Sequence, residues 1–161
     1  MKMNNITLIG MPGAGKSTLG VVLAKILGYE FLDSDLLIQK EEKRRLYQII
    51  DEEGDDGFKR IENRVIATGG SVVYCSEAME HLKSIGKVVY LSLSLESLEK
   101  RLGNLKKRGV LLKEGQTLKS LYEERVPLYE KYADIVVDEE GKDLEASLQA
   151  LLETLQTGVI K

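Results

Sequence analysis

The sequence predicts an α/β fold in which a parallel sheet carries helices on both faces. Five short β-rich runs alternate with stretches of helical spacing, and a glycine-rich loop follows the first run. Such alternation is typical of βαβ units. The run at residues 88–91 (VVYL) is apolar throughout, as expected for a strand that is covered on both sides. With 161 residues, the chain is expected to form one domain, residues 1–161.

The expected strands and helices alternate along the whole chain. The strands are expected at residues 5–9, 30–33, 65–68, 88–93 and 135–137. The helices are expected at residues 15–27, 36–42, 46–53, 58–63, 76–84, 95–102, 117–132 and 143–155. Gly28, Gly54 and Gly86 come at the ends of three helices, where glycine is common. Ligands of open parallel sheets bind beyond the carboxyl ends of the strands, so the loops there should form one crevice.

The glycine-rich loop carries the most specific pattern in the chain. Residues 10–17 (GMPGAGKS) match G-x-x-x-x-G-K-[ST] at every defining position, between an expected strand and an expected helix. The glycines let consecutive N–H groups point at an anion, and the helix N-terminus adds partial positive charge. Lys16 is expected to reach the β- and γ-phosphates, and the Ser17 hydroxyl to bind Mg²⁺. The loop therefore predicts a site for a nucleoside triphosphate, with a chance glycine-rich turn as the alternative.

Two further segments follow strands at the same edge of the predicted sheet. Asp33 and Asp35 close the second strand, and two such carboxylates suit the water shell of Mg²⁺ and a base for an attacking hydroxyl. The alternative is that Asp35 only caps the helix that follows it. Gly69 and Gly70 end the third strand, where either a ligand approaches the backbone closely or the chain simply turns.

Composition excludes several classes of function. The net charge of −3 and the lack of a recognisable basic face argue against nucleic acid as the main partner. No apolar run approaches the roughly 20 residues of a membrane span, and no signal peptide is expected. The single cysteine, Cys75, cannot form an intramolecular disulfide, which fits a cytoplasmic location. His81, the only histidine, is expected at the surface, which excludes histidine-based triads. A monomer is the default expectation.

Four segments, in order along nearly the whole chain, resemble the shikimate kinase family. Residues 9–20, 31–35, 65–70 and 121–129 match the family's opening loop, F-x-D-x-D, V-I-A-T-G-G and L-Y-x-x-R-x-P-L-Y. The resemblance implies a P-loop NTPase-type three-layer fold with strand order 2-3-1-4-5. It implies transfer of the γ-phosphate of ATP to the 3-hydroxyl of shikimate, a step of aromatic amino-acid biosynthesis. ATP and Mg²⁺ are the implied cofactors, and a small-molecule acceptor is the implied partner.

The resemblance also implies roles at the nucleotide end of the site. Arg101 would stack on adenine, and Arg108 would close over the phosphates on a lid at about residues 103–116. Asp33 would hold Mg²⁺ together with Ser17. The loop residues implied to bind the nucleotide are Gly13, Ala14, Gly15, Lys16, Ser17 and Thr18.

At the acceptor end, residues at about 34–64 would form the binding segment. Asp35 would bind the acceptor and accept its hydroxyl proton, while Gly69 and Gly70 would present backbone N–H groups. Arg125 would pair with the shikimate carboxylate, for which a planar fork of donors is suited. The alternative for Arg125 is a solvated arginine on a charged helix. Lys16, Asp35 and Arg108 are therefore the expected catalytic residues, and Lys59 is a further expected acceptor contact.

Four departures from the family pattern concern the acceptor and the lid. Lys59 stands where the family has a second substrate arginine, which keeps the charge and loses the bidentate fork. Ser71 replaces a third glycine, and residues 108–111 (RGVL) replace the family's R-P-L-L. Only residues 63–64 separate Glu62 from the third expected strand, which is few for a typical connection of about 2–6 residues. Either the chain carries a true deletion here or a stretch is absent from this sequence, and the abrupt helix end favours the second.

Two alternative functions remain open on these residues. One is a kinase of the same fold that acts on another small anionic polyol or sugar acid, which Lys59 and Ser71 motivate. The other is a non-catalytic nucleotide-binding regulatory module. The presence of Lys16, Ser17 and both aspartates argues against the second.

Overall fold

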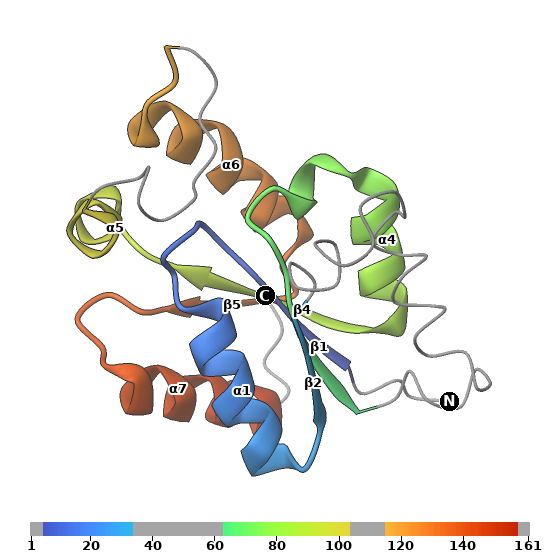
Figure 1. The fold of residues 1–161 in the computed structure, drawn as a ribbon. Coiled ribbons are helices and arrows are strands. Elements are labelled where there is room, and N and C mark those ends of the chain that lie inside the picture. Colours follow the sequence, from blue (N-terminus) through green and yellow to red (C-terminus); the bar gives the residue numbers. More distant parts are fainter. Residues whose placement is uncertain (1–4, 34–62, 104–114, 158–161) are drawn as a thin grey trace.

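A computed structural model of the chain describes residues 5–33, 63–103 and 115–157, and it has the predicted α/β architecture in three layers (Figure 1). Its strands form one parallel sheet in the order β2-β3-β1-β4-β5. This is the implied order 2-3-1-4-5, so the fold prediction is confirmed. The strands are β1 (Asn5–Ile9), β2 (Glu30–Asp33), β3 (Arg64–Ala67), β4 (Gly86–Ser92) and β5 (Ile135–Asp138).

The helices pack on both faces of the sheet. Helices α1 and α7 cover one face, and α4 and α6 cover the other (Figure 1). Strands β1 and β3 are buried along their whole length, because the sheet is covered on both sides. The helices are α1 (Lys16–Leu27), α4 (Ser76–Ile85), α5 (Leu95–Leu102), α6 (Leu118–Tyr132) and α7 (Leu144–Thr157), with a 3₁₀ turn, η2 (Val72–Tyr74).

Most element boundaries agree with the sequence-based expectation within two residues. Strands β1 and β2 begin and end as predicted, and β4 begins two residues earlier than expected. Helix α6 begins after Thr117, whose side chain accepts a hydrogen bond from the Ser120 N–H in a capping box. The expected helices at residues 36–42 and 46–53 lie outside the described residues, as does that at 58–63 except for its last residue.

Two glycines expected at helix ends have different structural roles. Gly28 has a φ of 69° and closes α1 in the left-handed conformation, as predicted. Gly86 also directly follows the last residue of α4, as predicted, but its φ of 174° is extended and it is at the same time the first residue of β4. A Cβ at Gly86 would overlap the carbonyl oxygen of Asn5 on the neighbouring strand. Glycine is needed there for close strand approach. Gly54 lies outside the described residues.

The short connection before β3 is completed by one unusual residue. Asn63 was expected at the end of a helix, but its φ is 66°, in the left-handed region that asparagine tolerates. Its carbonyl accepts a 3.0 Å hydrogen bond from the Glu30 N–H, and the Arg64 N–H donates to Asn5 Oδ1 at 2.9 Å. The two explanations for the short connection, a true deletion or an absent stretch, stay predictions. A single left-handed residue directs the chain into the strand.

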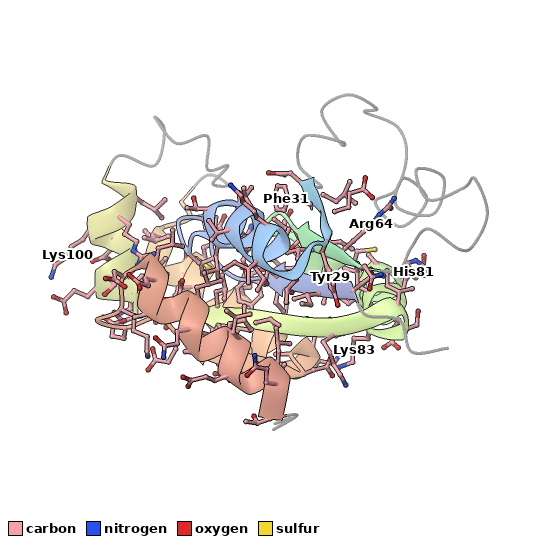
Figure 2. The ribbon with its side chains drawn as sticks, turned by 90° about the horizontal axis from the view of Figure 1, so that it is seen from below. Tyr29, Phe31, Arg64, His81, Lys83 and Lys100 are labelled. Atoms are coloured by element: carbon pink, nitrogen blue, oxygen red, sulfur yellow. The ribbon has the colours of Figure 1, made fainter. Side chains whose placement is uncertain are left out.

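The two ends of the sheet differ in their side chains. Arg64, His81 and Lys83 gather at one end of the molecule, and Lys100 of α5 lies at the other (Figure 2). The glycine-rich loop follows the carboxyl end of β1, whereas Arg64 begins β3, so the only histidine lies away from the loop. No helix within the described ranges is long and apolar enough to cross a membrane.

Candidate active site

The loop between β1 and α1 has the curled conformation that the glycine pattern predicts. Gly13 and Gly15 have φ angles of 86° and 85°, which L-residues other than glycine rarely adopt. The Ala14 N–H donates a 3.1 Å hydrogen bond to the Met11 carbonyl and tightens the turn. Gly15 is the N-cap of α1, so the helix N-terminus opens directly behind the loop. This is the arrangement that binds phosphate groups.

Lys16 folds back over this loop. Its ammonium group donates hydrogen bonds of 2.8 Å to the Gly10 carbonyl and 2.9 Å to the Met11 carbonyl. Lys16 is 9% exposed, which is low for a lysine. These carbonyls hold a positive charge at the mouth of the loop, where an anion would meet it.

Ser17 and Asp33 join the first turn of α1 to the end of β2. The Ser17 hydroxyl donates a 3.0 Å hydrogen bond to Asp33 Oδ2. Hydroxyl and carboxylate oxygens are the hard donors that Mg²⁺ prefers. No cluster of three potential histidine, cysteine or acidic ligands occurs in the described part of the chain. An ion held here by Ser17 and Asp33 would therefore complete its shell with water and phosphate oxygens.

Arg101 reaches the same loop from α5. Its Nη1 donates a 3.3 Å hydrogen bond to the Gly13 carbonyl, so the structure brings this predicted residue to the nucleotide end of the site. Helix α5 is fixed at its other end by Glu140, whose carboxylate accepts hydrogen bonds from the Ser94 N–H and the Ser97 hydroxyl. Thr18 is exposed on the first turn of α1.

Glu139 is a buried carboxyl group at this end that the sequence analysis missed. It directly follows β5, and its N–H donates a 3.0 Å hydrogen bond to the Ser92 carbonyl. Burial raises the pKa of Glu139 to about 7, although the charges of Arg101 and Lys16 act in the opposite direction. Its Oε2 is buried and has no hydrogen-bond partner among the described residues. The available signal was its position, since an acidic residue directly after the last strand lies at the same edge as the loop.

Arg125 and Gly70, both predicted to contact the acceptor, lie against each other in the structure. Arg125 is 8% exposed, so the alternative of a solvated arginine on α6 is wrong. A Cβ at Gly70 would lie only 2.8 Å from Arg125 Nη1, which shows that the guanidinium lies directly against this glycine. The Tyr129 hydroxyl donates a 2.6 Å hydrogen bond to the Gly70 carbonyl, and burial raises the pKa of Tyr129 above its usual range. Gly70 is therefore held between an arginine and a buried tyrosine.

Gly69 and Ser71 flank this contact. The Gly69 carbonyl accepts a 3.1 Å hydrogen bond from the Val72 N–H and turns the chain into η2. Ser71 has φ −88° and ψ −2°, a conformation open to any L-residue. The replacement of the family's third glycine by serine thus introduces no backbone strain.

Several predicted site residues lie outside the described part of the chain. These are Asp35, Lys59 and Arg108, together with most of the expected acceptor segment and lid. The described residues therefore bring together the phosphate loop with Ser17, Asp33 and Arg101, and they bring Arg125 to Gly70, which itself lies against Pro12 of the loop.

Comparison with known proteins places the chain in a family. The family model described as shikimate kinase matches residues 12–156. A shikimate kinase of Persephonella marina is 37% identical over 151 residues, covering 87% of this chain and 92% of that protein. A shikimate kinase of Francisella tularensis subsp. novicida is 40% identical over 155 residues, covering 88% of each.

A solved structure agrees with this assignment. The shikimate kinase of Acinetobacter baumannii, in complex with shikimate, superposes with a TM-score of 0.77 at 32% identity. The match covers 99% of this chain and 96% of that one. The strand order of the sheet agrees with this likeness. This chain belongs to the shikimate kinase family.

Proposed function

We propose that this chain transfers the γ-phosphate of ATP to the 3-hydroxyl of shikimate. The observation that carries the proposal is the placement of two charged sites beyond the carboxyl ends of β1 and β3. Lys16 and its loop form one, and Arg125 with Gly70 forms the other. Because β1 and β3 are neighbouring parallel strands, both sites lie at one edge of the sheet, where a triphosphate and an anionic acceptor can meet.

The nucleotide end would act mainly by positioning and by neutralising charge. Loop N–H groups and Lys16 would hold the phosphates, and Arg101 would lie beside the adenine. Mg²⁺ would be held by Ser17 and Asp33, directly or through water, and would supply positive charge next to the transferring phosphoryl group.

The transfer itself would form a bond between the acceptor oxygen and the γ-phosphorus and break the bond to the β-phosphate oxygen. The leaving group is ADP, and the proton of the acceptor hydroxyl would pass to Asp35. Arg108, on the lid, would close over the phosphates and exclude water. These two roles are carried over from the family pattern.

The acceptor end would recognise a carboxylate. Arg125 is buried and positive, so it is suited to an acid group that leaves water on binding. Lys59 would supply a second positive charge without the fork of an arginine. Gly69 and Gly70 would let the acceptor approach the backbone. We further propose that the protein is a cytoplasmic monomer and that its main partners are these small molecules.

A coupled assay of ADP release tests the proposal. The protein is supplied with MgATP and with shikimate, with no acceptor, or with a panel of sugar acids and polyols. Saturable release that depends on shikimate, with phosphorus transferred to the acceptor by ³¹P NMR, is the expected result. ADP release with a different acceptor alone would show that the protein is a kinase for that acceptor and not for shikimate. If no acceptor causes ADP release from protein that binds ATP, the non-catalytic regulatory module would be favoured.

Lys16→Ala is the matched control for the assay. It removes the ammonium group that faces the phosphates, and turnover should fall by about two orders of magnitude or more. Near-normal turnover in this variant would contradict the assignment of the loop.

A further inference from the structure

The side chain of Tyr74 contacts Arg125 in two ways. Arg125 Nε donates a 3.3 Å hydrogen bond to the Tyr74 hydroxyl oxygen. The guanidinium carbon also lies 5.3 Å from the centroid of the Tyr74 ring, within the range of a cation–π contact. Tyr74 ends the 3₁₀ turn η2, so it reaches the arginine from a different element.

We propose that Tyr74 is a positioning residue that fixes the Arg125 guanidinium for a carboxylate-bearing acceptor. This inference rests on the proposed function, because it deepens the role given there to Arg125. It adds a residue that the sequence motifs did not single out.

The geometry sets which edge of the guanidinium meets the acceptor. Nε is engaged by Tyr74, and Nη1 lies against Gly70. The Tyr129 side chain also hydrogen-bonds Arg125. The edge formed by Nη1 and Nη2 is therefore the one we expect to offer a carboxylate two parallel hydrogen bonds, beside Gly70 and Tyr129. An approach through Nε and Nη2 would require the Tyr74 contact to break.

Fixing the side chain has a physical benefit for binding. A long arginine loses rotamer freedom when it is ordered on a ligand, and this loss weakens binding. Tyr74 and the packing against Gly70 order the guanidinium before the acceptor arrives. The effect matters more in this chain, because Lys59 lacks the bidentate fork of the family's second arginine.

The exposure of Tyr74 supports a role beyond packing. Tyr74 is 48% exposed, while the neighbouring Val72 and Val73 are buried in the core. A tyrosine that contributed only to the core would be covered like these valines. Instead, its ring lies on the buried guanidinium and its own surface remains open to solvent.

The test is a graded pair of variants measured by steady-state kinetics. Tyr74→Phe removes the hydroxyl and keeps the ring, and Tyr74→Leu removes both contacts. The KM for shikimate should rise about 3- to 10-fold in the first variant and further in the second, since each lost contact loosens Arg125. The kcat and the KM for ATP should stay within about twofold, because the nucleotide end is untouched.

The matched control is Tyr122→Phe. Tyr122 lies on α6 like Arg125, and its hydroxyl donates a 3.1 Å hydrogen bond to the Leu93 carbonyl, away from the guanidinium. Removal of this hydroxyl should leave the shikimate KM unchanged.

The second measurement repeats the Tyr74→Phe change in an Arg125→Ala background. The value kcat/KM for shikimate can be measured below saturation in this background. If Tyr74 acts through Arg125, the second change should cause no further loss. An equal further loss, or an unchanged KM in both Tyr74 variants, would overturn the inference. If the wild-type protein shows no shikimate-dependent release at all, the proposed function fails instead.

Discussion

The hydroxyl of Ser17 and the carboxylate of Asp33 are joined by a 3.0 Å hydrogen bond, although 16 positions separate them in the sequence. Ser17 lies on the first turn of α1, and Asp33 is the last residue of β2. The pair meets because α1 packs along the sheet beside β2 and β3, with Gly20 against the Phe31 ring. Two oxygen atoms of the kind that Mg²⁺ prefers thus lie beside the glycine-rich loop.

If this pair holds Mg²⁺, Asp33→Asn should weaken Mg²⁺ binding and leave the conformation of the glycine-rich loop unchanged. Loss of one carboxylate charge should raise the Mg²⁺ concentration for half-maximal activity about 10-fold or more. A titration of activity with Mg²⁺ at saturating ATP and shikimate measures this. Glu30→Gln, at the other end of β2, is the control and should not shift the midpoint. An unchanged midpoint in Asp33→Asn would remove Asp33 from the metal site.

Gly70→Ala should impair acceptor binding more than folding. A Cβ there would lie 2.8 Å from Arg125 Nη1 and 3.0 Å from Pro12 Cδ, so the end of the arginine side chain must move. The shikimate KM should rise about 10-fold, as expected when a charged pairing is displaced. Ser71→Ala, at the next position, is the control, and it should retain the wild-type KM. An equal rise in the shikimate KM of both variants would show that the contact between Gly70 and Arg125 is not needed for acceptor binding.

Glu139 should make stability depend on pH. Its pKa is raised to about 7 from an ordinary value of 4.5, so the folded state binds more protons than the unfolded state between these values. Stability is therefore greatest below about pH 4.5 for this group and falls as the pH rises toward 7 and above. The loss should be on the order of 1–3 kcal/mol.

Urea unfolding at pH 5 and pH 8 measures this loss. Glu139→Gln should be less sensitive to the change of pH than the wild-type protein, because a neutral amide does not titrate. Glu145→Gln, on the exposed first turn of α7, is the control and should follow the wild type. A Glu139→Gln variant with the full wild-type pH dependence would show that Glu139 is not the group that makes stability depend on pH.

Gly86→Ala should destabilise the fold without a specific effect on either substrate. The added Cβ would overlap the Asn5 carbonyl, and backbone in a central strand cannot move aside as a flexible side chain can. We expect a loss of about 1–3 kcal/mol in the free energy of unfolding. Lys87→Ala, at the exposed next position, should cost less than about 0.5 kcal/mol. A Gly86→Ala protein as stable as the wild type would show that β1 and β4 can separate.

The sequence by itself determined the sheet and the phosphate loop. Alternating β-rich and helical runs predict parallel strands, and the glycines at positions 13 and 15 are required by local backbone conformation. The end of α1 at Gly28 is also a local matter, because the left-handed conformation depends on that residue alone. Such features follow from short-range physics and can be read from neighbouring residues.

Only the tertiary structure decided the environments of residues whose neighbours are distant in the sequence. Gly86 is required by Asn5 on another strand, Arg125 is buried against Gly70 and Tyr74, and Glu139 is placed near Lys16. Burial and partner charges set what these side chains can do, and both depend on how separate elements pack. The sequence therefore predicted the phosphate loop, while the structure showed how Arg125 is held against Gly70 and Tyr74.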